Sequence, residues 1–178
     1  MIQIERERKQ RRYLTFCAVA LLITYHLTLT TSCSSIDCPV QNTVAVNYGI
    51  VDVLGQTVEC TDTIYIWTQR ADGNDTLILN RGVNLSSFSL PMSYQHPEDM
   101  LVIYITDLDH EHETLDTIWL KKNDFPHFES VDCGTHFFHE LTDVSYTRRG
   151  IDTISINNRN VNYDQTVTHL NICFKARQ

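Results

Sequence analysis

The sequence predicts an all-β protein, a single antiparallel β-sandwich of immunoglobulin-like architecture that follows a cleaved N-terminal signal peptide. Apolar side chains alternate with polar ones at a period of two through much of the chain after residue 43, which is typical of half-buried strands. Turn-forming residues recur at intervals of roughly ten residues. No window repeats its apolar residues at the helical period of 3.6. These patterns predict about eight to ten short strands in one domain, residues 43–178.

Residues 1–32 have the composition of a targeting segment and are set apart from the fold. Five basic side chains lie between residues 6 and 12, the apolar run Leu14–Ile23 follows, and Thr30, Thr31 and Ser32 precede Cys33. A charged start, an apolar middle and small residues at the end are typical of a secretory signal peptide. A retained transmembrane anchor is the alternative, although a spanning helix needs about 20 mostly apolar residues.

Cys33 makes this segment more than a plain export signal. The stretch Leu29-Thr-Thr-Ser-Cys33 resembles a bacterial lipobox, although Thr30 stands where that motif prefers Leu. The motif's cysteine receives fatty acyl chains such as palmitate and becomes the new N-terminus. One chain anchors a protein only marginally, so firm attachment needs two or more. The alternative is ordinary cleavage near Ser32, with Cys33 left for a disulfide.

This interpretation divides the chain into three parts and predicts its location in the cell. Residues 1–32 are the lipoprotein signal peptide, residues 33–42 are the acylated cysteine and a short tether, and residues 43–178 are the β-sandwich domain. The predicted location is the cell envelope, where the lipid on Cys33 holds the protein to a membrane facing the periplasm or the cell surface.

The strands are predicted where the alternation is clearest. Met100 to Ile105 is a continuous apolar run, which indicates a central strand covered on both faces. The Asp72-Gly73 step between two alternating runs is the strongest hairpin signal. The other predicted strands are centred on residues 44–50, 64–67, 77–79, 88–90, 118–120, 144–146, 154–156 and 170–174.

Charge and motif content exclude several classes of function. The chain carries 14 basic and 22 acidic residues, a formal charge of −8. Because a nucleic-acid binder needs a basic face to neutralise phosphates, we expect no nucleic-acid partner. The sequence contains no G-x-S-x-G, Walker A or G-x-G-x-x-G motif. We therefore expect no catalytic residue and no cofactor.

Four cysteines remain in the exported chain when Cys33 is acylated: Cys38, Cys60, Cys133 and Cys173. An oxidising compartment permits two disulfides, in three connectivities. We favour Cys38–Cys133 together with Cys60–Cys173. Free buried thiols, which behave as small hydrophobes, are the alternative.

The tripeptide Asp-Thr-Ile/Leu occurs four times and has two interpretations. Asp suits a turn, and Thr followed by an apolar residue suits the first pleats of a strand, so the repeats can mark strand starts. The tripeptide also resembles the O-glycosylation acceptor that Bacteroidetes use on exported proteins. The candidate acceptors are Thr63, Thr76, Thr117 and Thr153.

The sharpest polar cluster is the segment from Asp107 to Glu113, which contains His110 and His112. On an extended chain, residues two apart share a face, so these two imidazoles would form a two-nitrogen metal chelate. Zinc usually takes three or four protein ligands. The candidates for a third, which the sequence does not place, are His127, His136 and His139. A solvated hairpin tip, in which crowded charge discourages edge pairing, is the alternative.

Four short segments are similar to one known family. They are Ser34–Pro39, Leu90–Ser93, His127–Cys133 and Val161–Asp164, and they resemble the small uncharacterised cell-envelope lipoproteins of Bacteroidetes with one β-rich domain of unknown function. The likeness runs from about Cys33 to Lys175. It implies envelope location, lipid on Cys33 and a Cys38–Cys133 pair. Cys60 and Cys173 lie outside the pattern, and the family brings no activity or ligand.

Two functional hypotheses follow. The first is a non-catalytic envelope lipoprotein that acts as a binding or structural module for a partner protein, a glycan or the cell wall. Exposed aromatics such as Trp67 or Trp119 on a sheet face would favour it, because exposed apolar patches mark binding surfaces. The alternative is a metal-binding protein that uses His110 and His112.

Overall fold

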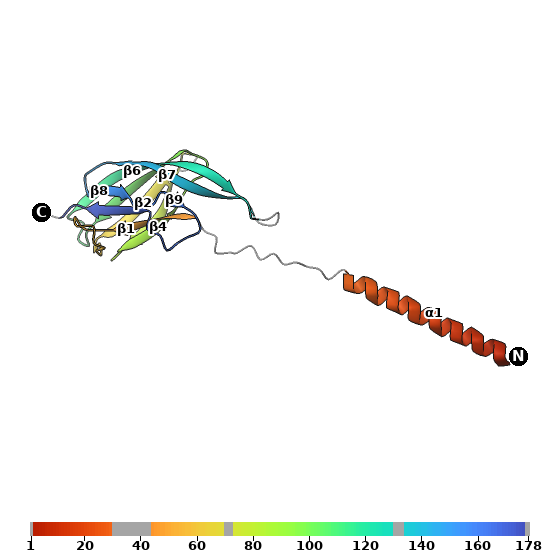
Figure 1. Ribbon diagram of the computed structural model, residues 1–178. Coiled ribbons are helices and arrows are strands. Elements are labelled where there is room, and N and C mark those ends of the chain that lie inside the picture. Colours follow the sequence, from red (N-terminus) through yellow and green to blue (C-terminus); the bar gives the residue numbers. More distant parts are fainter. Residues whose placement is uncertain (1, 30–43, 70–72, 130–133, 177–178) are drawn as a thin grey trace. The chain divides into compact units, whose positions relative to one another are not determined.

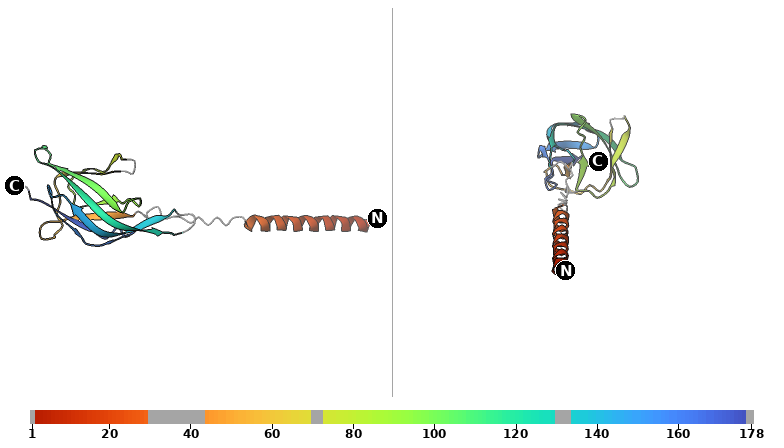
Figure 2. Two further views of the ribbon diagram at one scale, coloured as in Figure 1. Left: turned by 90° about the horizontal axis from the view of Figure 1, so that it is seen from above. Right: turned by 90° about the vertical axis from the view of Figure 1, so that its right-hand side faces the viewer.

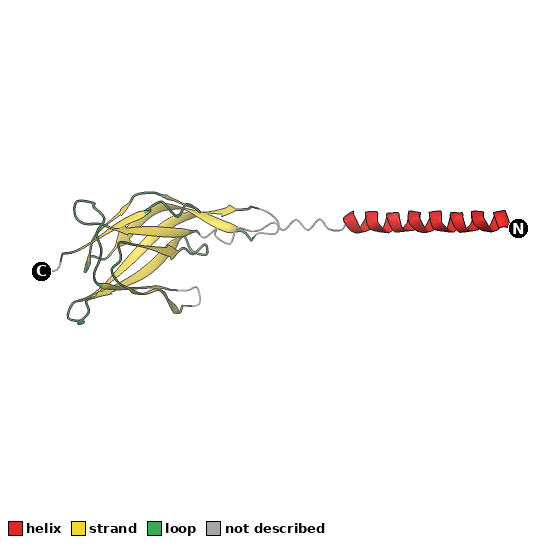
Figure 3. Cartoon of the chain, turned by 90° about the horizontal axis from the view of Figure 1, so that it is seen from below, coloured by secondary structure: helices red, strands yellow, loops and turns green. Residues whose placement is uncertain are grey.

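The computed structural model describes residues 2–29, 44–69, 73–129 and 134–176. The chain divides into two units, Met1–Asp37 and Cys38–Gln178. The first unit contains the helix α1 (Ile2–Leu29), and all the strands lie in the second unit (Figures 1 and 3). Among the described residues, no helix has an apolar stretch long enough to cross a bilayer. Cys33 and Cys38 lie outside the described residues.

Ten strands of the described chain form two sheets that share one core. The six-stranded sheet has the order β3-β2-β5-β6-β7-β9, and the four-stranded sheet has the order β4-β1-β10-β8. The strands are β1 (Ala45–Ile50), β2 (Thr63–Gln69), β3 (Asp75–Gly82), β4 (Ser87–Pro91), β5 (Glu98–Thr106), β6 (Glu113–His127), β7 (His136–Tyr146), β8 (Ile151–Ile156), β9 (Asn160–Val161) and β10 (Leu170–Phe174).

The predicted all-β sandwich is confirmed. Each segment predicted as a strand lies in or overlaps an observed strand. β5, predicted to be central, lies between β2 and β6. The expected hairpin joins β2 to β3, with Gly73 at a φ of 80° that favours glycine. One departure from a wholly antiparallel sandwich is the parallel pair of β1 and β10.

The core lies between the inner faces of the two sheets. Ile64, Ile103 and Leu120 come from the six-stranded sheet, and Tyr48 and Ile172 come from the four-stranded sheet. Tyr48 stacks on Phe88 with ring centroids 4.8 Å apart. Burial of these rows supplies the main free energy of folding, at about 25 cal/mol for each Å² of apolar surface removed from water.

Buried polar contacts hold the parallel pair of β1 and β10 together. The Asn47 backbone N–H donates to His169 Nδ1 at 3.0 Å, and His169 N donates back to the Asn47 carbonyl at 2.9 Å. Burial lowers the pKa of His169, which keeps Nδ1 free of a proton and able to accept. These contacts specify the register of two strands that no hairpin connects.

The expected Cys60–Cys173 disulfide is absent from this structure, and the described residues contain no disulfide. Cys173 is a buried free thiol next to the core residue Ile172 on β10, so alternation turns its side chain to the opposite face of the strand. Cys60, by contrast, packs against the core. Cys133 lies outside the described residues, as Cys38 does, so that pairing stays a prediction.

The chain passes from one sheet to the other at residues 147–150, and the buried carboxylate of Asp116 on β6 holds that crossing. Oδ1 accepts from Thr147 Oγ1 at 2.5 Å and Arg149 N at 2.8 Å, and Oδ2 accepts from Gly150 N at 2.6 Å and Ile151 N at 2.9 Å. Burial alone would raise the pKa of Asp116, but these hydrogen bonds outweigh it and lower the pKa.

We predict that Asp116→Asn destabilises the protein by about 3 kcal/mol at pH 7, because an amide nitrogen cannot accept the backbone N–H bonds. Since the folded pKa is lowered, the stabilisation is present above the ordinary Asp pKa near 4 and is lost as pH falls through the folded value. Urea unfolding of the purified chain at pH 7 and pH 3 measures both effects.

Asp152→Asn is the matched control for this prediction. Asp152 pairs with Arg148 at 3.1 Å on the surface, so its loss should cost less than about 1 kcal/mol. Equal destabilisation by the two substitutions, or a gap that widens on acidification, would contradict the role given to Asp116.

Candidate functional site

One end of the core is polar. On the inner faces of three adjacent strands, the side chains in the middle of the core are buried Ile or Leu, and those at one end of it are charged or imidazole side chains. We call this cluster the polar end: Asp99 on β5, Lys122 and Asp124 on β6, and His139 on β7. Charged side chains at core-facing positions break the two-period pattern, and such exceptions are expected at functional sites.

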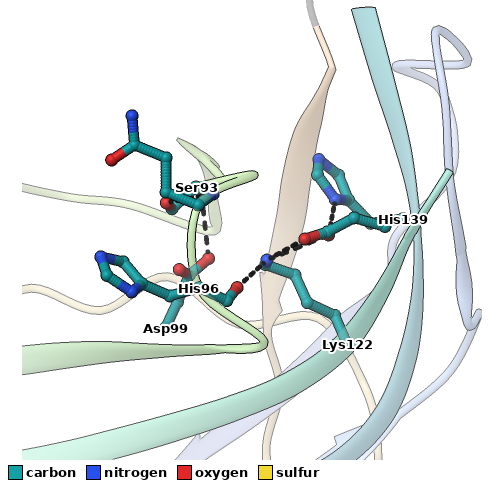
Figure 4. A network of polar contacts seen from close by, with 7 residues as sticks. Ser93, His96, Asp99, Lys122 and His139 are labelled. Carbon is teal, nitrogen blue, oxygen red and sulfur yellow. Dashed lines mark hydrogen bonds and ion pairs between the residues drawn. The ribbon is translucent and has the colours of Figure 1, made fainter. Parts of the chain in front are cut away.

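Lys122 is the centre of the polar end. Its side chain is fully buried, and Nζ donates to the His96 carbonyl at 2.6 Å and to the two Asp124 carboxylate oxygens at 3.0 and 3.1 Å (Figure 4). An unpaired buried ammonium would cost several kcal/mol. The contact with the His96 carbonyl ties the β4–β5 loop, which contains His96, to β6, and the two contacts with Asp124 pair the ammonium within β6.

His139 shares the Asp124 carboxylate with Lys122. His139 Nδ1 lies 2.6 Å from Asp124 Oδ1, and the imidazole is almost completely buried (Figure 4). The strands β6 and β7 place them together, because Asp124 and His139 are cross-strand partners. Because the Asp124 carboxylate contacts both Lys122 and His139, the three side chains hold one another in fixed positions.

Asp99 adds a second carboxylate beneath the β4–β5 loop. Its Oδ2 accepts the Ser93 backbone N–H at 3.2 Å. Burial raises the pKa of Asp99, and the nearby charge of Lys122 opposes part of that rise. Two carboxyl groups, those of Asp99 and Asp124, and one ammonium, that of Lys122, thus lie beneath the loop.

Two hollows flank the β4–β5 loop and share Gln95, His96 and Pro97 as lining residues. The hollow on the β2 side has a volume of about 880 Å³. The hollow on the β6 side has a volume of about 560 Å³ and is lined also by Tyr94 and Phe125. Both volumes fall within the range of small-ligand pockets, roughly 300–1,000 Å³.

A second candidate surface lies on the outer face of the six-stranded sheet. Cross-strand register places Trp67 opposite Leu77 and Val102, and Tyr65 opposite Tyr104. Leu77 and Leu115 are 41% and 46% exposed. We call this surface the outer face. It consists of the cross-strand partners whose side chains point away from the core and are apolar or Thr: Tyr65, Trp67, Leu77, Met100, Val102, Tyr104, Leu115, Thr117 and Trp119.

The rings on this outer face lie close to one another without being buried. Tyr65, Trp67 and Tyr104 have centroids 5.9 to 6.3 Å apart, and each of the three rings is half-buried. Hydrogen bonding to Glu113 raises the pKa of Tyr104. The two tryptophans that would favour a binding module, Trp67 and Trp119, therefore lie on one sheet face.

His110 and His112 lie at the tip of the β5–β6 hairpin. The expectation that they share a face assumed extended backbone, but residues 107–112 form a turn in which His110 has a φ of 57°. His110 Nδ1 lies 3.1 Å from Thr106 Oγ1, and His112 Nδ1 lies 2.8 Å from Asp107 Oδ2. No three His, Cys, Asp or Glu side chains in the described chain are grouped to hold a metal ion.

The four Asp-Thr-Ile/Leu repeats have different surroundings. Thr63 and Asp75 begin β2 and β3, and Asp152 is the second residue of β8, so three repeats mark strand starts. Asp116 lies inside β6 and has the structural role described above. Thr153 is exposed, Thr76 and Thr117 are half-buried, and Thr63 is buried. Exposure thus favours Thr153 as an acceptor.

Sequence reasoning missed the polar end. Lys122 and Asp124 follow the apolar alternation of Ile118 and Leu120, and continuing that alternation would have placed both on the inner face. His139 on β7 supplies the imidazole of the polar end. Its partner Asp124 is 15 residues away, and no spacing motif joins them.

Comparison with known proteins gives a family and no assigned activity. A family model described as a family of unknown function, DUF6452, matches residues 63–174, which is the greater part of the β-sandwich. A search of curated proteins found no match. A search of solved structures also found none.

We predict that Lys122→Met destabilises the protein by about 3 kcal/mol, because it leaves the Asp124 carboxylate without its ammonium partner. Lys121→Met at the neighbouring exposed position should change the stability by less than about 0.5 kcal/mol. Urea unfolding of both variants measures the difference. If the two variants lose the same stability, the buried contacts of Lys122 do not hold the polar end together.

Proposed function

The chain belongs to a protein family of unknown function, DUF6452, and on that premise we propose that it is a non-catalytic, lipid-anchored binding module of the cell envelope. It binds an envelope protein through the outer face of the six-stranded sheet. The observation that carries this proposal is the row of half-buried Tyr and Trp rings on a face made of β2, β5 and β6.

The composition of the outer face supports a protein partner. Interface cores are enriched in Tyr, Trp and Met and depleted in charged residues, and the outer face contains Tyr65, Trp67, Met100 and Trp119. Trp and Tyr are also the residues that most often dominate binding energy. Contiguous exposed apolar surface on a sheet is costly in water unless a partner covers it.

The lipid anchor is supported by the sequence before the domain. The lipobox-like stretch that ends at Cys33 precedes the sandwich by only a short segment. Acyl chains on Cys33 would hold the domain at a membrane surface, facing the periplasm or the cell surface. A protein confined to a surface meets partners in the same envelope at a raised effective concentration.

We predict that the native chain extracted from membranes has the intact mass of residues 33–178 plus fatty acyl chains on Cys33. Cys33→Ser should remove the lipid mass, whereas Cys38→Ser should retain it. Added hexose-sized masses would report O-glycosylation in the same spectrum. A mass that includes Met1, or a lipid-free chain, would contradict the anchor.

We predict that a photo-crosslinking amino acid at Leu115 captures a discrete protein in intact cells, whereas the same amino acid at exposed Ser155 on β8 does not. Trp67→Ala should weaken the Leu115 adduct at least tenfold, as expected for an interface hot spot. Far-ultraviolet circular dichroism checks that the variant stays folded. Equal adducts at both positions, or an adduct indifferent to Trp67→Ala, would overturn docking by the outer face.

A further inference from the structure

We propose that the hollow between the β4–β5 loop and β6 is a binding site for a neutral saccharide. Its lining is a mixture of two exposed aromatic rings, planar polar side chains and a neutralised buried charge: Tyr94, Gln95, His96, Pro97, Lys122, Asn123, Asp124 and Phe125. None of these residues belongs to the outer face, so the site is independent of the proposed protein partner.

The rims of the hollow carry stacking surfaces. Tyr94 is 58% exposed, and one face of its ring lies parallel to Phe137, with centroids 4.7 Å apart and planes 5° apart. Phe125 is 50% exposed and is the cross-strand partner of Phe138. Backing by a second strand holds these rings in place while leaving ring surface open. Such surface attracts the C–H groups of a sugar ring through its negative face.

The polar lining suits hydroxyl groups. The exposed side chain of Gln95 offers both donors and acceptors. Asn123 Nδ2 donates to Glu140 Oε2 at 3.4 Å, and its amide oxygen is an acceptor. The exposed imidazole of His96 offers one donor and one acceptor when neutral. A sugar hydroxyl also donates and accepts, so planar amides can engage it from both sides. A purely apolar ligand would leave these groups unpaired, at a cost in free energy.

The charge of the lining disfavours anions. Of the described residues that line the hollow, Lys122 is the cation, and its ammonium is already engaged by Asp124 and the His96 carbonyl. Asp124 and the nearby Asp99 supply carboxyl groups and no further cation. A phosphorylated, sulfated or carboxylated ligand would find no free cationic partner among these residues, whereas a neutral saccharide needs none.

The polar end explains why this hollow keeps its shape. The Lys122–His96 hydrogen bond fastens the β4–β5 loop at 2.6 Å, and Lys122 N also donates to the Pro97 carbonyl at 3.0 Å. A loop held at two points loses little freedom on binding, which favours affinity. The second hollow, of about 880 Å³, lies across the same loop and is lined by Met100 of the outer face, so the proposed saccharide site is confined to the hollow on the β6 side.

The test uses the full chain, purified in a detergent without a sugar headgroup, on an array of neutral oligosaccharides, anionic oligosaccharides and short peptides. The expected result is retention of neutral oligosaccharides alone. Titration calorimetry with the best neutral oligosaccharide should then show at least a tenfold loss of affinity for Tyr94→Ala and for Phe125→Ala.

Phe128→Ala is the matched control, because Phe128 is 63% exposed and lies three residues after Phe125 but does not line the hollow. The oligosaccharide affinity of this variant should equal that of the wild type. Gln95→Leu, a change of similar size at an exposed loop position that lines the hollow, should weaken binding without affecting folding. Retention of peptides or anionic oligosaccharides instead, no retention at all, or equal losses for Phe125→Ala and Phe128→Ala would each overturn the proposal.

Discussion

The buried carboxylate of Asp116 is the contact on which the sandwich depends. It lies on β6 of the six-stranded sheet, and its four hydrogen bonds hold the segment that leads from β7 into β8 of the other sheet. Three of its donors are backbone N–H groups, and that of Ile151 is buried, where an unpaired donor would be costly. A single ionised side chain thereby fixes how one sheet continues into the other.

The polar groups at the two ends of the core are hydrogen-bonded in different ways. At the Asp116 end, main-chain donors close around one carboxylate, and a hollow of about 300 Å³ lined by Arg149 and Gly150 lies beside it. At the polar end, side chains on three strands satisfy one another, and a loop is tied over them by Lys122. The second arrangement leaves open volume on both sides of the loop. The two larger hollows therefore lie where the core ends in side-chain contacts rather than in backbone hydrogen bonds.

The six-stranded sheet has apolar side chains on both faces, although only its inner face packs against the other sheet. Along β2, Ile64 and Ile66 pack in the core while Tyr65 and Trp67 face outward. The inner row packs between the two sheets, and the outer rings face away from that core. The long strands β6 and β7 pair along most of their length and extend beyond the rest of the sandwich (Figures 1 and 2).

Local sequence determined the strands, because alternation and turn chemistry act over neighbouring residues. The β2–β3 hairpin at Asp72-Gly73 and the central strand at Met100–Ile105 followed from these signals alone. The order of strands did not, since β1 pairs with β10 across more than a hundred residues through Asn47 and His169. Likewise, Asp116, Lys122 and His139 read as ordinary polar residues of strands. Only the packing of distant strands decided that their charges are buried and satisfied, because the partners of a buried polar group are set by tertiary contacts.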